Sequence, residues 1–165
     1  MVCPAGYYCR VGTHAADQYP CPAGTFSAKL NLTDPAQCET CPVGAYCPLG
    51  SVGPTLCGAG SYQPNTGGHH IQSCRNCPPS WSCPQQGQQW YNDTCLPGHY
   101  CPAATVNPTD HPCPAGTYTN SSSLRRLEDC TICPARRSCL AGTGGDGKLW
   151  LPCAKGHYCP EGTQY

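Results

Sequence analysis

Apolar side chains are sparse along this chain, and the most regular of them are aromatic residues that lie beside cysteines. Val, Leu, Ile, Met and Phe together make up 19 of the 165 residues, too few for a conventional hydrophobic core. The regular aromatics are Tyr8, Phe26, Tyr46, Tyr62, Tyr100, Tyr118 and Tyr158. Turn residues bound each of them, so the pattern predicts minimal two-stranded hairpins around these aromatics and little other regular secondary structure.

The aromatics belong to a repeated frame of Cys, two residues, Gly, one residue, an aromatic and a seventh residue. It occurs nine times, and its first cysteines are Cys3, Cys21, Cys41, Cys57, Cys77, Cys95, Cys113, Cys133 and Cys153. We number the copies one to nine and the frame positions one to seven. Position four is Gly except for Ser80 in copy five and Arg136 in copy eight. A fixed period of this kind indicates a tandem repeat array.

Each copy contains a second cysteine, and the nine pairs account for all 18 cysteines. In the short copies it follows the first cysteine by six residues, at Cys9, Cys47, Cys83, Cys101, Cys139 and Cys159. In the long copies, which are copies two, four and seven, it follows by seventeen residues, at Cys38, Cys74 and Cys130. The long copies therefore enclose polar loops, and Ser121 to Asp129 is the only segment in which we expect a helical turn.

Composition points to covalent links in place of a core. Gly and Pro each number 19, which favours turns, and the cysteine content marks a disulfide scaffold. We expect the seven aromatics to cover adjacent disulfides as a ladder of ring-on-sulfur contacts. So many regularly spaced cysteines imply an oxidising compartment, so we expect a secreted or cell-surface protein.

A second, longer repeat groups the copies. Six cysteines from Cys3 to Cys47 map onto Cys95 to Cys139 with a constant offset of 92 residues. We expect four groups: residues 1–50 with copies one to three, 51–92 with copies four and five, 93–148 with copies six to eight, and 149–165 with copy nine. Because the first frame begins at Cys3 without an apolar leader, we expect a segment of a longer array.

The cysteine pairs of Cys-x-x-Cys type admit other chemistry. Cys38 and Cys41, Cys74 and Cys77, and Cys130 and Cys133 have the spacing of half a zinc site or of a redox motif. However, these motifs recur 36 and 56 residues apart instead of about 15 to 20, and Pro follows each second cysteine. We therefore expect no metal and no cofactor.

Catalytic and nucleic-acid functions find little support. The six histidines, His14, His69, His70, His99, His111 and His157, are scattered over loops, and no nucleophile, base or carboxylate pair stands out. The formal net charge is +0, which argues against nucleic acid, and no apolar stretch is long enough to insert into a membrane. The basic doublets Arg125-Arg126 and Arg136-Arg137 mark either a partner contact or, more simply, solvated loop charges. We expect that the protein is not an enzyme.

The frame resembles a known class of extracellular module. CPxGxY, a polar loop and then CxxCPxGxYC, clearest at Cys21 to Cys47 and Cys113 to Cys139, resembles the ephrin-receptor-like cysteine-rich repeats, relatives of EGF-like and TNF-receptor-like modules. Tandem CPAGYYC arrays are also similar to protist and algal surface proteins, including flagellar-hair (mastigoneme) components. The resemblance implies an elongated tandem array of small disulfide-rich repeats that acts as an extracellular spacer or binding rod.

Two disulfide connectivities remain open. Because CPVGAYC at Cys41 repeats the self-contained CPAGYYC at Cys3, we expect each copy to close on its own second cysteine. The alternative is the crossed ladder of TNF-receptor modules, with Cys21 bonded to Cys41 and Cys38 to Cys47. Sequence alone does not decide between them.

Two functions follow. The first is a structural protein, a glycosylated and disulfide-stapled rod that packs with copies of itself or with neighbouring fibre proteins into a surface fibre or appendage such as a flagellar hair. The second is the ectodomain of a receptor or adhesin that binds a protein ligand. The regular 92-residue offset favours the fibre, because a receptor concentrates irregular residues at one site.

N-linked glycosylation is the first testable prediction. Asn31, Asn92 and Asn120 begin Asn-x-Ser/Thr sequons in polar segments, whereas Pro108 excludes Asn107. We expect protein from its native source to exceed the polypeptide mass and to lose the excess on enzymatic deglycosylation. An intact mass equal to that of the bare polypeptide would contradict the prediction.

Overall fold

The computed structural model describes residues 2–145 and 150–164, which form two compact units. The first unit comprises Met1–Arg75 with Gln85–Trp90, and the second comprises Asn76–Pro84 with Tyr91–Tyr165. The predicted border between residues 148 and 149 lies outside the described residues. Each unit is built from consecutive copies of the frame.

Strands of two or three residues are the main regular structure. The first unit contains β1 (Thr25–Phe26), β2 (Glu39–Thr40), β3 (Ala45–Tyr46), β4 (Thr55–Leu56) and β5 (Ser61–Tyr62). The second contains β7 (Trp81–Ser82), β8 (Asp93–Thr94), β9 (Thr117–Tyr118), β10 (Thr131–Ile132), β11 (Arg137–Cys139) and β12 (Trp150–Pro152). β6 (Arg75–Asn76) contains the division between the units. This confirms the predicted fold class, a small disulfide-rich fold of short hairpins.

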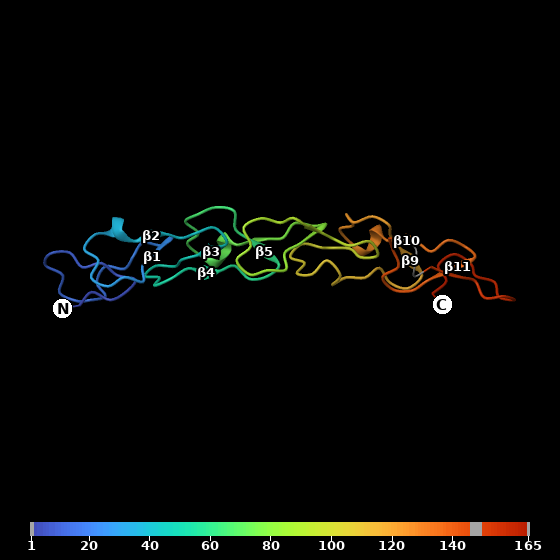
Figure 1. Ribbon diagram of the computed structural model, residues 1–165, viewed down its shortest axis with the longest axis horizontal. Helices are drawn as coiled ribbons and strands as arrows, with labels where there is room; N and C mark the ends of the chain where they lie inside the picture. The colour runs from blue at the N-terminus through green and yellow to red at the C-terminus, as the bar shows by residue number, and fades with distance from the viewer. Residues whose placement is uncertain (1, 146–149, 165) are drawn as a thin grey trace. The chain divides into compact units, whose positions relative to one another are not determined.

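Each hairpin joins one copy to the start of the next. In β1 and β2, which lie side by side in Figure 1, Thr25 is opposite Thr40 and Phe26 is opposite Glu39. Thr25 and Phe26 occupy positions five and six of their frame, and Glu39 and Thr40 immediately precede the next frame. The antiparallel pairs β3–β4, β7–β8, β9–β10 and β11–β12 repeat this arrangement.

The long loops correct one expectation. All three contain a single 3-10 turn immediately before their second cysteine, namely η1 (Pro35–Gln37), η2 (Ile71–Ser73) and η3 (Leu127–Asp129). Ser121 to Asp129 is therefore not the only helical segment, and its turn is confined to the last three residues. The first turn has a capping box, because Asp34 accepts from the Ala36 N–H and Gln37 reaches back to the Asp34 N–H.

Within each unit, a pair of backbone hydrogen bonds at position four links one copy to the next. In copy two, the Gly24 N–H donates to the carbonyl of Cys47, at position seven of copy three, and the Gly24 carbonyl accepts from the Cys41 N–H. The N–H bond recurs at Gly6, Gly44, Ser80, Gly98, Gly116 and Arg136, and so does the carbonyl bond. Position four is therefore the backbone joint between consecutive copies.

A second pair of hydrogen bonds widens this joint. The Cys47 N–H donates to the Gly68 carbonyl in the loop of copy four, and the Gly67 N–H in the same loop donates to the Cys41 carbonyl. The same pair joins Cys139 to Thr163 and Gly162 to Cys133. Four backbone bonds therefore define the interface between neighbouring copies, and buried disulfides lie behind it.

Position four requires the left-handed backbone region at every copy. φ is 75° at Gly44, and it is also positive at the two non-glycine exceptions, 76° at Ser80 and 69° at Arg136. Several of these glycines also lie against the copy two further along the chain. A Cβ on Gly24 of copy two would be 2.8 Å from the Gly67 carbonyl oxygen of copy four. Gly6, Gly44, Gly98 and Gly116 make equivalent or closer approaches. Where copy five has Ser80, its hydroxyl donates to the Ser123 carbonyl of copy seven at 2.7 Å.

The aromatic ladder is only partly as expected. Tyr8 packs on the cluster containing the Cys21 and Cys38 disulfide of the next copy, and Phe26 packs on the cluster containing Cys41 and Cys47, which confirms the prediction there. For Tyr158 the prediction is wrong, because this ring is 86% exposed. Several others have an aromatic partner, such as Tyr118 and Trp150, whose ring centroids are 4.8 Å apart.

The glycine joint generates a paired prediction. In Gly44→Ala, the alanine is strained by the left-handed backbone and its Cβ also clashes with the Gly87 carbonyl. In Gly12→Ala, only the backbone strain remains, because nothing lies within 4 Å of the Cβ position. We expect Gly12→Ala to cost about 1 kcal/mol and Gly44→Ala about 3 kcal/mol. Amide hydrogen exchange in the oxidised protein measures both costs locally. Equal effects of the two substitutions would contradict the role of the close approach.

Candidate functional site

All 18 cysteines are paired within their own copies. The short copies contain Cys3–Cys9, Cys41–Cys47, Cys77–Cys83, Cys95–Cys101, Cys133–Cys139 and Cys153–Cys159, and the long copies contain Cys21–Cys38, Cys57–Cys74 and Cys113–Cys130. This is the local connectivity, and the crossed ladder does not occur. The Cys-x-x-Cys motifs are therefore junctions between two disulfides.

The described residues show no group of three or more His, Cys, Asp or Glu side chains arranged to hold a metal ion. The histidines have separate local contacts. The Nδ1 of His99 lies 3.2 Å from the Pro97 carbonyl and that of His157 lies 3.3 Å from the Lys155 carbonyl, so the two equivalent residues make the same backbone contact. The His111 ring stacks on Tyr100.

The three sequon asparagines are exposed, as a glycosylation site requires. Asn31 also has a structural contact: its Oδ1 accepts from the Cys3 N–H at 3.0 Å, and its own N–H donates to the Cys3 carbonyl at 2.9 Å. In later copies such as copies two and three, the N–H of the equivalent first cysteine donates instead to the position-four carbonyl of the preceding copy. Glycosylation at Asn31, Asn92 and Asn120 remains a prediction.

The basic doublets are spread over different contacts. Arg126 forms an ion pair with Asp129 at 3.4 Å, and Arg137 lies over the Trp150 ring at 5.0 Å from its centroid. Arg136 is exposed. Arg126 and Arg137 therefore have separate local partners within the second unit.

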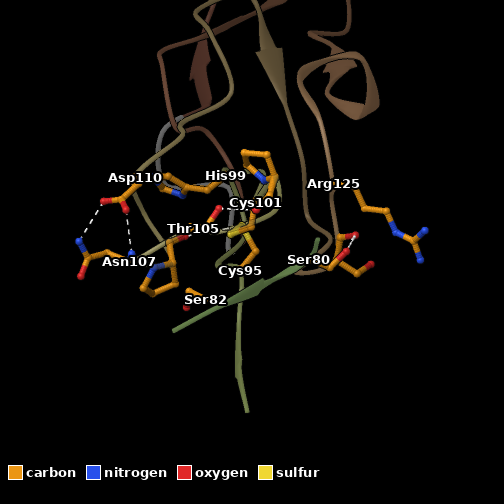
Figure 2. The surroundings of a disulfide bond; sticks show 12 residues. Ser80, Ser82, Cys95, His99, Cys101, Thr105, Asn107, Asp110 and Arg125 are labelled. Atoms are coloured by element: carbon orange, nitrogen blue, oxygen red, sulfur yellow. Dashed lines mark hydrogen bonds between the residues drawn. A yellow bond between two sulfur atoms is a disulfide. The ribbon is translucent and has the colours of Figure 1, made fainter. Parts of the chain in front are cut away.

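A polar turn beside the Cys95–Cys101 disulfide holds one perturbed carboxylate. Figure 2 shows the Asn107 side chain and Asp110 joined across the loop, while Ser80 and Arg125 lie on the opposite side of the disulfide in this view. The Asn107 N–H and Nδ2 donate to Asp110 at 2.8 and 3.0 Å. These two hydrogen bonds, the backbone one foremost, lower the pKa of Asp110 below its ordinary value.

A polar groove in the first unit is the surface that sequence reasoning missed. It encloses about 380 Å³ and is lined by Gln63, Asn65, Thr66, Gly67, Gly68, His69, His70, Gln72, Ser73 and Arg75. The groove lies in the loop of copy four. Its sequence signal is Gly67-Gly68, which stands where the other long loops have Asn31-Leu32 and Ser123-Leu124. That difference appears only when the three long loops are aligned with one another.

An apolar hollow lies on copy nine. It has a volume of about 410 Å³ and is lined by Ser138, Leu151, Pro152, Ala154, His157, Tyr158 and Cys159. In the same copy the Gly156 N–H and carbonyl, the Cys159 N–H and the Cys153 carbonyl have no hydrogen-bond partner among the described residues. The equivalent four groups of copy eight, on Arg136, Cys139 and Cys133, all bond to copy nine. These four groups are therefore the ones through which a further repeat would continue the array.

Comparison with known proteins adds no assignment: no protein-family model matches this chain, and no curated protein matches it. Among the described residues, no helix has both the length and the apolar composition needed to cross a bilayer.

The Asp110 contact predicts a pH effect. Because its pKa is lower in the folded protein than in the unfolded chain, this carboxylate stabilises the fold above about pH 4, and that contribution is lost as the pH falls through the folded-state pKa. We expect Asn107→Ala to raise the pKa of Asp110, as measured by carbon NMR titration. Asn65→Ala is the control and should leave this titration unchanged. An unchanged Asp110 titration in Asn107→Ala would contradict the assignment.

Proposed function

We propose that this protein is an extracellular structural protein whose cysteine-rich repeats, similar to ephrin-receptor-like and EGF-like modules, assemble into a surface fibre or appendage such as a flagellar hair. The disulfide-rich repeated fold supports an oxidising, extracellular setting. A fold held by disulfides and backbone bonds leaves little interior for an active site, so the proposal includes no catalytic role. Attached glycans and other copies of the same chain are its proposed partners.

The observation that carries the proposal is the repeated backbone joint between copies, whose equivalent groups on copy nine fit a further repeat, in the same polypeptide or in a second copy. The four unpartnered backbone groups match those that bond one copy to the next elsewhere in the array. Tyr158 is exposed beside the apolar hollow. Unpaired backbone groups next to apolar surface form a template for another chain of the same kind. A further cysteine-rich repeat therefore supplies the chemistry that fits this face.

Copy one has three of the four complementary groups, because the fourth, the Cys3 N–H, already donates to the Asn31 Oδ1. By comparison with later short copies, the groups that would meet a preceding repeat are the Cys9 carbonyl, the Gly12 N–H and the Thr13 carbonyl, and these have no partner among the described residues. Val11 beside them is fully exposed. A contact between copy nine of one chain and copy one of another is heterologous, and such contacts build open filaments when their rotation does not close.

Arg136 would hinder this contact sterically if copy one of the second chain followed copy nine in the same way as one copy follows another within the chain. Glycines at position four approach the copy two further along the chain, as Gly98 of copy six approaches Gly142 after copy eight. An incoming copy one would place Gly12 opposite Arg136, which has a Cβ where the other joints have only a glycine hydrogen. We therefore expect the chain to associate weakly, with Arg136 as the residue that limits association.

The alternative function is a receptor or adhesin ectodomain that binds a protein ligand. The polar groove at residues 63–75 favours it, because the groove is unlike the other two long loops. The two functions differ in what the chain meets, a copy of itself or a different molecule.

Association in solution tests the structural proposal. We expect Arg136→Gly to strengthen self-association of the oxidised chain at least tenfold relative to wild type in analytical ultracentrifugation. Arg136→Ala is the matched control, because it removes the same charge but keeps the Cβ, and it should remain near wild type. Adding Tyr158→Asp to Arg136→Gly should restore the monomer, because it places a charge in the apolar hollow.

Strictly monomeric behaviour of both wild type and Arg136→Gly would contradict assembly through copy nine. Electron microscopy of material from the natural source provides the direct observation: filaments with these chains in the repeating wall support the structural function. Isolated chains that capture a soluble protein ligand would support the receptor instead.

A further inference from the structure

The polar groove of copy four has a composition that sets it apart from the rest of the chain. No Asp or Glu occurs between Thr40 and Asn92, and the groove contains Arg75, His69 and His70. The equivalent loop of copy two contains Asp34 and pairs Glu39 with Lys29 at 3.1 Å. The loop of copy seven contains Glu128 and Asp129. Of the three long loops, this one alone has basic residues and no Asp or Glu in its own sequence to balance their charge.

The groove includes a loop position at which the other two long copies have a buried leucine. Leu32 and Leu124 are buried at one loop position of copies two and seven, 6% and 8% exposed. Gly68 occupies that position in copy four, where a Cβ would be 2.6 Å from the Ala45 carbonyl oxygen. This position of copy four therefore has neither the leucine side chain nor room for one.

Gln63 supplies a free donor inside this hollow. At the same frame position, the hydroxyls of Ser27 and Thr119 accept from the N–H two residues later. The Gln63 Oε1 makes this contact with the Asn65 N–H at 3.4 Å. Its Nε2 has no hydrogen-bond partner among the described residues, although Gln63 is only 4% exposed. This amide donor lines the groove and has no protein partner, so it is available to the acceptor of a ligand.

The remaining lining groups complete an anion site. Arg75 offers a planar set of N–H donors suited to carboxylate and sulfate oxygens. The imidazoles of His69 and His70 lie at the same groove, and His70 Nδ1 is occupied by the Gln72 N–H at 3.3 Å. Asn65, Thr66 and Gln72 add amide and hydroxyl groups that both donate and accept, as sugar hydroxyls require.

We propose that this groove binds an acidic polysaccharide, with a sulfate or carboxylate group held by Arg75 and Gln63 and neighbouring sugar hydroxyls held by the amide and hydroxyl groups. The site lies wholly in the first unit and does not involve copy one or copy nine contacts. Loss of oligosaccharide binding would therefore not affect the proposed assembly, and loss of assembly would not affect this site.

Binding of defined oligosaccharides to the oxidised chain tests the site. Calorimetry at physiological salt would compare a sulfated oligosaccharide, a polyuronate oligosaccharide of the same length and a poly-glutamate peptide. We expect one or both oligosaccharides to bind, their ratio identifying the preferred anion, and the peptide to bind at least tenfold more weakly. Peptide binding as strong as that of the sugars would overturn the polysaccharide assignment.

Variants localise the binding to the groove. We expect Arg75→Gln to weaken oligosaccharide binding at least tenfold, and Gln63→Thr, which introduces the residue of copy seven, to weaken it about fivefold. Lys29→Gln is the matched control, because it removes one positive charge from the equivalent loop of copy two, and it should change affinity less than twofold. Equal losses in Arg75→Gln and Lys29→Gln would reduce the effect to general electrostatics and overturn the site.

A spectroscopic measurement separates contact from folding. The side-chain NH₂ resonances of Gln63 should shift on oligosaccharide addition in wild type and in Lys29→Gln. Disulfide mapping and amide spectra of each variant verify that the nine links and the loop are intact. A bound oligosaccharide that leaves the Gln63 resonances unmoved would place binding elsewhere on the chain and contradict the proposal.

Discussion

The fold depends on one backbone constraint, the left-handed residue at position four of each frame. That conformation turns both the N–H and the carbonyl of the residue toward the following copy, where they bond to position seven and to the first cysteine. The lack of a side chain at most of these positions also lets the copy after that approach closely. Disulfides hold each copy together internally, whereas the backbone bonds at position four hold consecutive copies of a unit against one another.

Much of this arrangement is visible in the sequence because it is local. The repeated Gly and the short hairpins follow from a motif that is complete within seven residues. The local disulfide pairing is one of two connectivities that the sequence leaves open, because the long copies pair cysteines 17 residues apart. Ser80 and Arg136 replace Gly without moving the cysteines, and the structure shows that both adopt the left-handed conformation. The turns at Pro35–Gln37 and Ile71–Ser73 are less apparent, since only Asp34-Pro35 has a strong capping signal.

What sequence reasoning missed depends on contacts between copies. Tyr158 has the same frame position as Tyr8, but a ring at this position is covered only when another copy lies beside it. The groove of copy four is similar, because its lining, and the close contact of Gly68 with the Ala45 carbonyl of the preceding copy, are known only from the structure. Periodicity identifies the equivalent positions, whereas the differences among them carry the candidate functions.

Closure of every disulfide within its own copy determines how the chain would respond to a mechanical load. When the two ends of a copy are pulled, tension passes from one cysteine to its partner through the sulfur atoms and bypasses the residues between them. Loops such as Ser27 to Gln37 would stay slack while the segments between disulfides straighten. Under load, extension is therefore confined to the segments between disulfides, and the loops enclosed by the disulfides are protected from being pulled out.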